Sequence, residues 1–209
     1  MKKITILIFL ILVGCGGNTQ IRNIQVNNLE IIESIRSTNC STGKHHQLYL
    51  KGVINDDSVV IVEKVLQQMP RCRDDKGIQK VPVVFLNSKG GYLSDGFKMG
   101  KLFTQYQVQT VIGDGDVCMS ACSTAFLGGY FRSMWGNSKL VVHAPYVRTS
   151  PYTIECQSKS KAEDLKSYYV SRLGNSQGDL LFEKTMQYCS SSNGWTLNKD
   201  AAELFGLLN

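Results

Sequence analysis

The chain has 209 residues, with 23 lysine and arginine residues against 17 aspartate and glutamate residues, so its formal net charge is +6. This length is enough for one ordinary domain with a sizeable core. The basic excess is mild, and no block of lysine and arginine is interleaved with aromatic residues, which argues against a nucleic-acid-binding protein.

The first residues have the pattern of an export signal rather than of a folded domain. Lys2 and Lys3 give a positive start, and Ile4 to Val13 form an apolar run that is too short to span a bilayer comfortably. The end of this run, Leu12-Val13-Gly14-Cys15, resembles the lipobox of bacterial lipoproteins, in which cleavage leaves the cysteine as a lipidated N-terminus. An ordinary signal peptide and a membrane anchor are the alternatives.

The lipobox resemblance implies three parts. Residues 1–14 would be a lipoprotein signal peptide, residues 15–45 a lipidated tether and lead-in, and residues 46–209 the folded domain. An acylated Cys15 would hold the exported protein at the periplasmic face of a bacterial membrane, inner or outer.

The cysteines indicate disulfides. Apart from Cys15, six cysteines occur, which is an even number for an oxidising compartment: Cys40, Cys72, Cys118, Cys122, Cys156 and Cys189. Their pairing stays open, and a bridge between Cys118 and Cys122 inside a regular helix would be geometrically marginal. A zinc site is the rival, but the spacings lack a paired C-x-x-C and only His45 and His46 are spare, so we expect neither metal nor cofactor.

Strands and helices alternate over most of residues 48–145. Apolar runs predict strands at 48–54, 81–86, 108–112 and 140–143, and another strand that ends near Val117. Helical spacing predicts helices after the turn at 55–58, after Gly90-Gly91, at 121–127, at 161–173 closed by Gly174, at 177–189 capped by Ser176, and from Asn198 to Gly206.

The remaining segments are expected to be less regular. Residues 20–46 are predicted to form an irregular lead-in that could contain one strand, and residues 70–80 and 150–160 are predicted to be loops. The alternation elsewhere predicts a layered α/β domain with a largely parallel sheet and flanking helices.

Three strands of this sheet end in residues that carry chemistry. Gly90-Gly91 closes one strand, Ser120 follows another at a strand-to-helix turn, and His143 closes a third. Since the carboxyl ends of parallel strands share one edge, these residues could converge. Ser120 alone is most simply a helix N-cap, and His143 alone a structural histidine, but together they suggest a nucleophile and its base.

Five segments in register resemble the ClpP/crotonase superfamily and, within it, the ClpP-like serine peptidases. They are LYLKGVINDDS, VVFLNSKGG with Lys89 where proline is usual, CMSACSTAFLGG, LVVHAP and DAAELFGLLN. The resemblance covers roughly residues 48–145 and 195–209.

The resemblance implies roles for particular residues. Ser120 would be the nucleophile and His143 the general base, and the backbone N–H groups of Gly91 and Ala121 would form the oxyanion hole. The family has an aspartate before its final helix, where this chain offers Asn193 as the nearest match, because Asp200 matches a position inside the helix. A Ser–Lys dyad through Lys89 is an alternative.

The expected function is an ATP-independent serine hydrolase, most simply a peptidase, that acts on peptides or unfolded segments. Asn193 in place of the family's aspartate motivates a second hypothesis. The protein would then be a weakly active or inactive lipoprotein that binds a peptide or a protein partner. Acyl-CoA chemistry of the crotonase type fits poorly, since an exported protein would not meet that cofactor. ClpP-like proteins commonly form rings, so a homo-oligomer is a further expectation.

Overall fold

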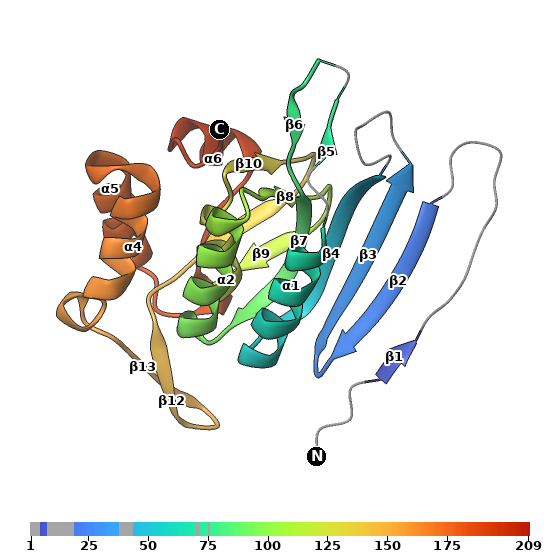
Figure 1. Cartoon of the computed structure of the whole chain (residues 1–209). Helices are drawn as coiled ribbons and strands as arrows, with labels where there is room; N and C mark the ends of the chain where they lie inside the picture. The colour runs from blue at the N-terminus through green and yellow to red at the C-terminus, as the bar shows by residue number, and fades with distance from the viewer. Residues whose placement is uncertain (1–4, 8–18, 38–43, 70–71, 75) are drawn as a thin grey trace.

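The computed structural model describes residues 5–7, 19–37, 44–69, 72–74 and 76–209, and its centre is a large twisted sheet (Figure 1). Ten strands of the described chain form this sheet: β1 (Thr5–Leu7), β2 (Thr19–Val26), β3 (Leu29–Ser37), β4 (Lys44–Ile54), β7 (Val83–Gly91), β8 (Gln109–Ile112), β9 (Val117–Met119), β10 (Phe131–Met134), β11 (Lys139–Val142) and β14 (Trp195–Leu197).

The sheet is parallel where the sequence alternates strand and helix, and it forks at β7. The first half of β7 pairs with β8, which in turn pairs with β10, and all these pairs are parallel. Near the end of β7, Ser88 pairs with Cys118 of β9, and β9 pairs with β11, again in parallel. Only β14 on this side is antiparallel. The fork therefore brings the ends of β7, β9 and β11 to one edge.

The N-terminal segment corrects one sequence-based prediction. The residues expected to be an irregular lead-in form β2 and β3, which pair with each other and with β4 in antiparallel fashion. The turn between them contains Asn27 at φ +50°, a left-handed conformation that asparagine tolerates better than most residues. Strand β1 pairs with β2, but it lies within residues 1–14, the expected signal peptide, so cleavage before Cys15 would remove this strand from the sheet. Cys15 and Cys40 lie outside the described residues.

Six helices occur in the described residues: α1 (Asp56–Gln68), α2 (Leu93–Gln105), α3 (Ala121–Leu127), α4 (Glu163–Leu173), α5 (Asn175–Thr185) and α6 (Lys199–Leu204). Figure 1 shows α1 and α2 lying across one face of the sheet. Helix α1 begins at the predicted turn, where Asn55 and Ser58 form a capping box. Two short 3-10 turns, η1 (Lys159–Lys161) and η2 (Ser191–Asn193), complete the helical part.

Helix α3 lies in the middle of the core. All seven of its residues are buried. Gly96 of α2 lies so close to Ala121 that a side chain at position 96 would meet the carbonyl oxygen of Ala121. On another side, the hydroxyl of Tyr168 in α4 donates a hydrogen bond of 2.9 Å to the carbonyl oxygen of Thr124. Helix α3 is thus fixed by two neighbouring helices as well as by the sheet.

The C-terminal part agrees with the sequence in most elements. Gly174 closes α4 at φ +82°, and Asn198 caps α6 by accepting a hydrogen bond from the N–H of Ala201. The predicted cap Ser176 is wrong, since α5 begins two residues before the predicted start at 177 and has Gly174 as its N-cap. Strands β10 and β14 were not predicted.

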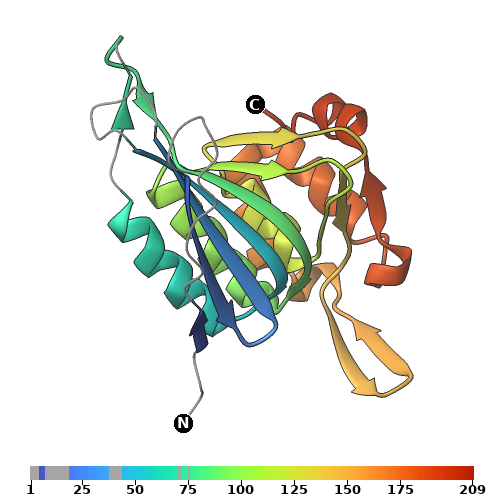
Figure 2. The ribbon, with the colours of Figure 1, turned by 90° about the vertical axis from the view of Figure 1, so that its right-hand side faces the viewer.

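Residues 146–156 form a hairpin, which replaces the first part of the loop predicted at 150–160. Strands β12 (Tyr146–Ser150) and β13 (Thr153–Cys156) pair in antiparallel fashion and project from the body of the molecule (Figures 1 and 2). A second small pair, β5 (Cys72–Arg73) and β6 (Gln79–Lys80), lies inside the segment predicted as a polar loop.

Two disulfides join described cysteines. One links Cys118 of β9 to Cys122 of α3, with their Cα atoms 5.2 Å apart, and the other links Cys156 to Cys189. The first bridge avoids the poor geometry of a bridge inside a helix, because it runs from a strand across a turn to the helix.

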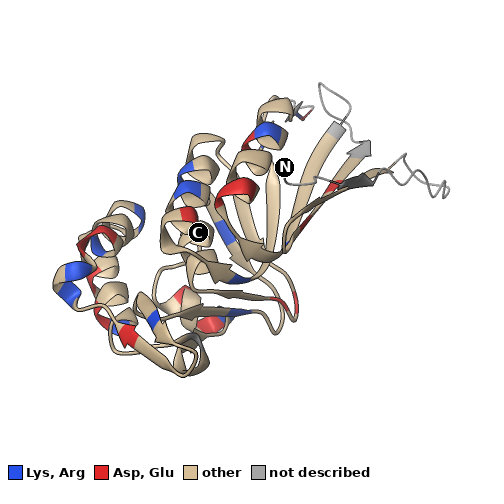
Figure 3. Cartoon of the chain, turned by 90° about the horizontal axis from the view of Figure 1, so that it is seen from below, with Lys and Arg blue, Asp and Glu red and all other residues tan. Residues whose placement is uncertain are grey.

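Charged residues of both signs are interspersed over the helices in the view of Figure 3. Among the residues that the structure describes, no helix combines the length and the apolar character needed to span a bilayer.

Candidate active site

Ser120 occupies a strained turn between β9 and α3. Its backbone has φ +59° and ψ −125°, a combination that a residue with a side chain rarely adopts. Such strain costs about 1–3 kcal/mol and persists only where the surroundings enforce it. The side chain makes no capping hydrogen bond to α3, so Ser120 is not an ordinary helix cap. The turn instead presents the hydroxyl as a nucleophile elbow does.

Hydrogen bonds hold this turn from both sides. The N–H of Ser120 donates to the carbonyl oxygen of Val141 at 2.9 Å. The hydroxyl of Ser123 donates to the carbonyl oxygen of Ser120 at 2.5 Å and lies 3.2 Å from that of Val141. Strand β11 therefore sets the conformation of Ser120, and it also carries His143 at its end.

The double glycine lies directly against the turn. Gly90 has φ +91°, and a side-chain carbon placed there would lie 2.6 Å from the carbonyl oxygen of Met119 and 2.8 Å from Cβ of Ser120. Gly91 lines the same pocket as Ser120. Because the first N–H groups of a helix have no intrahelical partner, the amide of Ala121 at the start of α3 is a natural oxyanion donor. The double glycine and the start of α3 thus lie beside the turn that carries the hydroxyl, although the amide of Gly90 itself donates to the hydroxyl of Ser88.

The ring of His143 has a defined tautomer. Its Nδ1 lies 2.9 Å from the carbonyl oxygen of Ala144, and since a carbonyl can only accept, Nδ1 carries the proton. Nε2 then has a free lone pair, and it is buried without a hydrogen-bond partner. This is the protonation state that a general base needs.

Burial lowers the pKa of His143, since an imidazolium there would lose its hydration, while the hydrogen bond to Ala144 raises it to a smaller extent. The ring is therefore neutral at neutral pH and able to accept a proton. It makes no hydrogen bond to Ser120 in this structure, a common situation before substrate tightens a catalytic pair.

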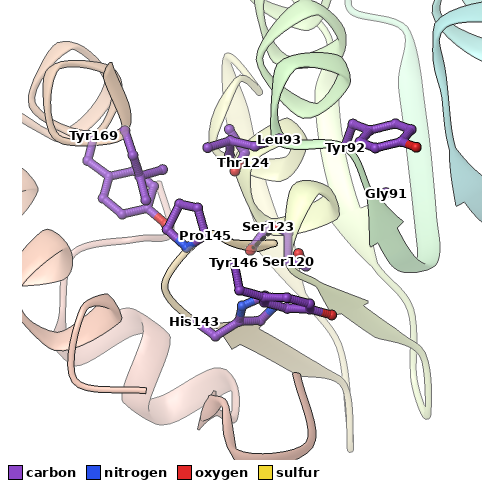
Figure 4. A pocket seen from close by; sticks show the side chains of 11 residues that line it. Gly91, Tyr92, Leu93, Ser120, Ser123, Thr124, His143, Pro145, Tyr146 and Tyr169 are labelled. Atoms are coloured by element: carbon purple, nitrogen blue, oxygen red, sulfur yellow. Dashed lines mark hydrogen bonds between the residues drawn. The ribbon is translucent and has the colours of Figure 1, made fainter. Parts of the chain in front are cut away.

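Two pockets meet at Ser120 and His143. The first, of about 130 Å³, extends toward α4 and is closed by Leu93, Thr124, Pro145, Leu165 and Tyr169. The second, of about 220 Å³, is lined by Val53, Lys89 and Gly90. Four residues border both pockets: Gly91, Ser120, His143 and Tyr146. Figure 4 shows Ser120 and His143 near each other, with Tyr146 beside the histidine ring.

The other predicted residues lie as follows. Asn193 is exposed in η2, and its backbone N–H donates to Ser190, whereas the Nδ1 partner of His143 is Ala144. The role expected of Asn193 therefore stays a prediction without a contact to support it. Lys89 is exposed at the second pocket, and Asp200 is exposed in the first turn of α6.

Three contributors to the site were missed in the sequence. Ser123 is one helical turn after Ser120. This spacing could have indicated that the hydroxyl of Ser123 donates to the carbonyl oxygen of Ser120. Tyr146 belongs to the unpredicted hairpin, and its ring centre lies 5.5 Å from that of His143. The carbonyl of Ala144 leaves no signal in a sequence, because every residue has one.

Comparison with known proteins identifies the fold through solved structures. The sequence matches no protein-family model and no curated protein. Solved structures do match. A mutant of the 1510-N membrane-bound stomatin-specific protease aligns with a TM-score of 0.57 and 15% identity, covering 77% of this chain and 75% of that chain.

Two further structures agree. Another mutant of the same protease, in complex with a substrate peptide, gives a TM-score of 0.58 and 16% identity, covering 77% of this chain and 71% of that chain. The ClpP protease catalytic domain from Plasmodium falciparum aligns with a TM-score of 0.54 and 19% identity, covering 77% of this chain and 81% of that chain. The chain has a ClpP-like fold.

The ClpP-like fold and the local geometry are independent observations. The fold comparison concerns the overall course of the backbone, whereas the local conformation of Ser120, the tautomer of His143 and the shared pockets are properties of particular residues of this chain. Both lead to the edge of the sheet where β7, β9 and β11 end.

Proposed function

We propose that this protein is a serine hydrolase, and most simply a peptidase, with Ser120 as nucleophile and His143 as general base. The strained conformation of Ser120 carries the proposal, because it exposes the hydroxyl to the pockets that the histidine ring also lines. A turn that served only to start a helix would have no need of this strain.

The mechanism uses groups that the chain itself supplies. Nε2 of His143 takes the proton of the Ser120 hydroxyl as the oxygen attacks a carbonyl carbon. The N–H groups of Gly91 and Ala121 stabilise the oxyanion, and one such donor contributes about 3 kcal/mol. The carbonyl of Ala144 orients the ring but stabilises the imidazolium less than a carboxylate would.

A peptide is the substrate that suits the two pockets. They lie on either side of Ser120, so an extended chain could place groups in both while its carbonyl meets the hydroxyl. Among the proteins of similar fold, the stomatin-specific protease has been solved with a substrate peptide. The first pocket, with Leu93, Leu165 and Tyr169, suits an apolar side chain.

Labelling by a fluorophosphonate probe tests the hydrolase. The protein should be labelled, Ser120→Ala should abolish labelling, and His143→Ala should slow it by about a hundredfold or more. Ser94→Ala, which changes an exposed serine on α2, is the matched control and should be labelled like the parent. Labelling that persists in Ser120→Ala would exclude Ser120 as nucleophile. Cleavage of an unstructured peptide library then separates a peptidase from an esterase.

A binding protein is the second candidate, and the carbonyl of Ala144 in the place of an acid favours it. Without a carboxylate the imidazolium is poorly stabilised, so the site could hold a peptide without cleaving it. Lack of labelling together with a measurable peptide affinity that falls in Tyr146→Ala would support this candidate.

We also propose that the protein acts outside the cytoplasm, without ATP, tethered to a bacterial membrane by a lipid on Cys15. The sequence Leu12-Val13-Gly14-Cys15 supports the tether, and two disulfides among the described residues suit an oxidising compartment. The Cys15→Ala variant should lose incorporated fatty acid and leave the membrane fraction. Unchanged membrane association of that variant would exclude a Cys15 anchor.

A further inference from the structure

The disulfide between Cys118 and Cys122 encloses the strained serine. Cys118 is in β9, Cys122 is in α3, and Ser120 lies midway between them. The bridge spans the turn at a Cα–Cα distance of 5.2 Å. A backbone held in an unfavourable conformation relaxes unless its flanks are fixed, and the bridge fixes both flanks.

The position of this bridge argues for a local role. The loop that it closes is short, with a sequence separation of 4, whereas Cys156 and Cys189 are separated by 33 residues. The stabilisation that a disulfide provides through the unfolded chain increases with loop length. Global stability is therefore the lesser effect of the Cys118–Cys122 bridge.

The core does not depend on this bridge for its packing. Both side chains are completely buried, in a cluster that contains Phe126 and Leu140. Free cysteines behave as small apolar residues and would remain acceptable there. The chain can consequently fold with two thiols at these positions while the turn between them is less constrained.

We propose that Cys118 and Cys122 are positioning residues for the nucleophile, so that Ser120 reaches its full reactivity only after this disulfide has formed. The inference rests on the proposed hydrolase function. In the oxidation, the two thiols give two electrons and two protons to a disulfide-containing oxidant, which becomes a dithiol. Hydrogen bonds from Ser120 and Ser123 remain in the reduced form, so the loss of reactivity is large but not complete.

The burial of the bridge determines when it forms. Neither sulfur can be reached from solvent in the folded protein, so an oxidant must act before α3 has packed, or during an opening of the turn. Cys189, by contrast, is exposed. The Cys118–Cys122 bridge is accordingly set during folding and is then kept from reductants.

The first test compares a variant without the bridge with a stability control. Cys118→Ala/Cys122→Ala should react with the fluorophosphonate probe at least about tenfold more slowly at saturation, with little change in the probe concentration for half-saturation. The pH at which the rate falls should not move, because His143 is untouched. Val62→Ala is the stability control, because it creates a cavity under α1 away from the pockets. It should lower the melting temperature and leave the labelling rate unchanged.

The second test changes no side chain. The protein is reduced with dithiothreitol in denaturant, refolded, and reoxidised with oxidised glutathione, while mass spectrometry follows each bridge. Most of the labelling should return with the Cys118–Cys122 bridge, and the Cys156–Cys189 bridge should add a smaller increase. This arm remains informative if the double alanine variant does not fold.

The outcomes separate the two proposals. The positioning role would be overturned if the parent is labelled and the double alanine variant is equally reactive. It would also be overturned if labelling returns before the Cys118–Cys122 bridge. Either result would leave the hydrolase proposal intact. An oxidised parent that is not labelled at all would overturn the hydrolase function and this inference with it.

Discussion

Nδ1 of His143 lies 2.9 Å from the carbonyl oxygen of Ala144, the residue that follows it in the chain. A backbone carbonyl thus takes the place that an acidic side chain has in a Ser-His-Asp triad. It fixes the same tautomer, because only a protonated Nδ1 can donate to it. It brings no negative charge, however, so it orients the base without strongly raising its pKa.

The first prediction concerns the pH dependence of labelling. Burial lowers the pKa of His143 below the usual histidine value of about 6.5, so the ring remains neutral, and able to accept a proton, to a lower pH than an ordinary histidine. The labelling rate should therefore be constant near neutral pH and should fall on the acid side only below about pH 6.5.

The same shift affects stability. The unfolded chain binds the histidine proton first as the pH falls, so the contribution of neutral His143 to folding is present above the unfolded pKa and is lost as the pH falls through the folded pKa. Labelling rates and urea unfolding at a series of pH values test both statements. A fall in labelling centred above about pH 6.5 would contradict the assignment of a buried neutral base.

The second prediction concerns Asn193. Its side chain is exposed and the ring of His143 already has a partner at Nδ1, so Asn193→Ala should lower the labelling rate by less than about threefold. A loss of about a hundredfold or more, as expected for an orienting residue, would return Asn193 to the catalytic group and show that the segment after Cys189 moves when substrate binds.

The third prediction concerns Gly90. Gly90→Ala places a carbon against Met119 and Ser120 and adds a side chain at φ +91°, so it should reduce labelling severely and destabilise the fold by about 1–3 kcal/mol or more. Gly115→Ala is the matched control, since Gly115 also has a positive φ, of +74°, but has open space around it.

Labelling rates and thermal unfolding of the two glycine variants separate backbone strain from contact with the turn. Both variants should lose stability, and only Gly90→Ala should lose reactivity. Equal reactivity of the two variants would mean that the glycine does not shape the site.

The central part of the fold could be predicted because its signals are local. The small apolar run Ala121–Leu127 between Val117 and Gly128 has the length and ends of a short buried helix, and the structure places it there. Strands β7 and β11 could be predicted because they contain continuous apolar runs, as parallel strands covered on both faces do.

The hairpins could be predicted less well, for two different reasons. Residues 24–31 carry alternating buried side chains on either side of Asn27-Asn28, a turn signal that was present but overlooked. Residues 146–156 carry no buried alternation, since their side chains are exposed or half-buried, and the hairpin is attached through Cys156 instead.

In the candidate site, the residue types could be predicted and the conformations could not. Ser120, His143 and Gly91 were chosen for their places at strand ends, and the structure brings all three to one pocket. The positive φ of Ser120 and the carbonyl partner of His143 arise from tertiary contacts with β11 and the residues that follow it. Such contacts are set by packing and are not encoded in a local motif.

The last prediction concerns the Cys156–Cys189 bridge, which secures the histidine side of the site. Cys156 pairs with Tyr146 in the hairpin, and the carbonyl oxygen of Tyr188, next to Cys189, accepts a hydrogen bond of 2.7 Å from the N–H of Ala144. The bridge therefore ties together the two segments that hold Ala144, the hydrogen-bond partner of the His143 ring.

Cys156→Ser/Cys189→Ser should destabilise the protein by about 3–4 kcal/mol, because this bridge closes a long loop. It should also slow labelling, since the Ala144 carbonyl is held less firmly against His143. Thermal unfolding and labelling over a pH series measure the two effects. Tyr152→Ala, at the exposed tip of the same hairpin, is the control and should change neither. A serine variant that unfolds at a lower temperature but labels at the parental rate would show that this bridge stabilises the fold without positioning the base.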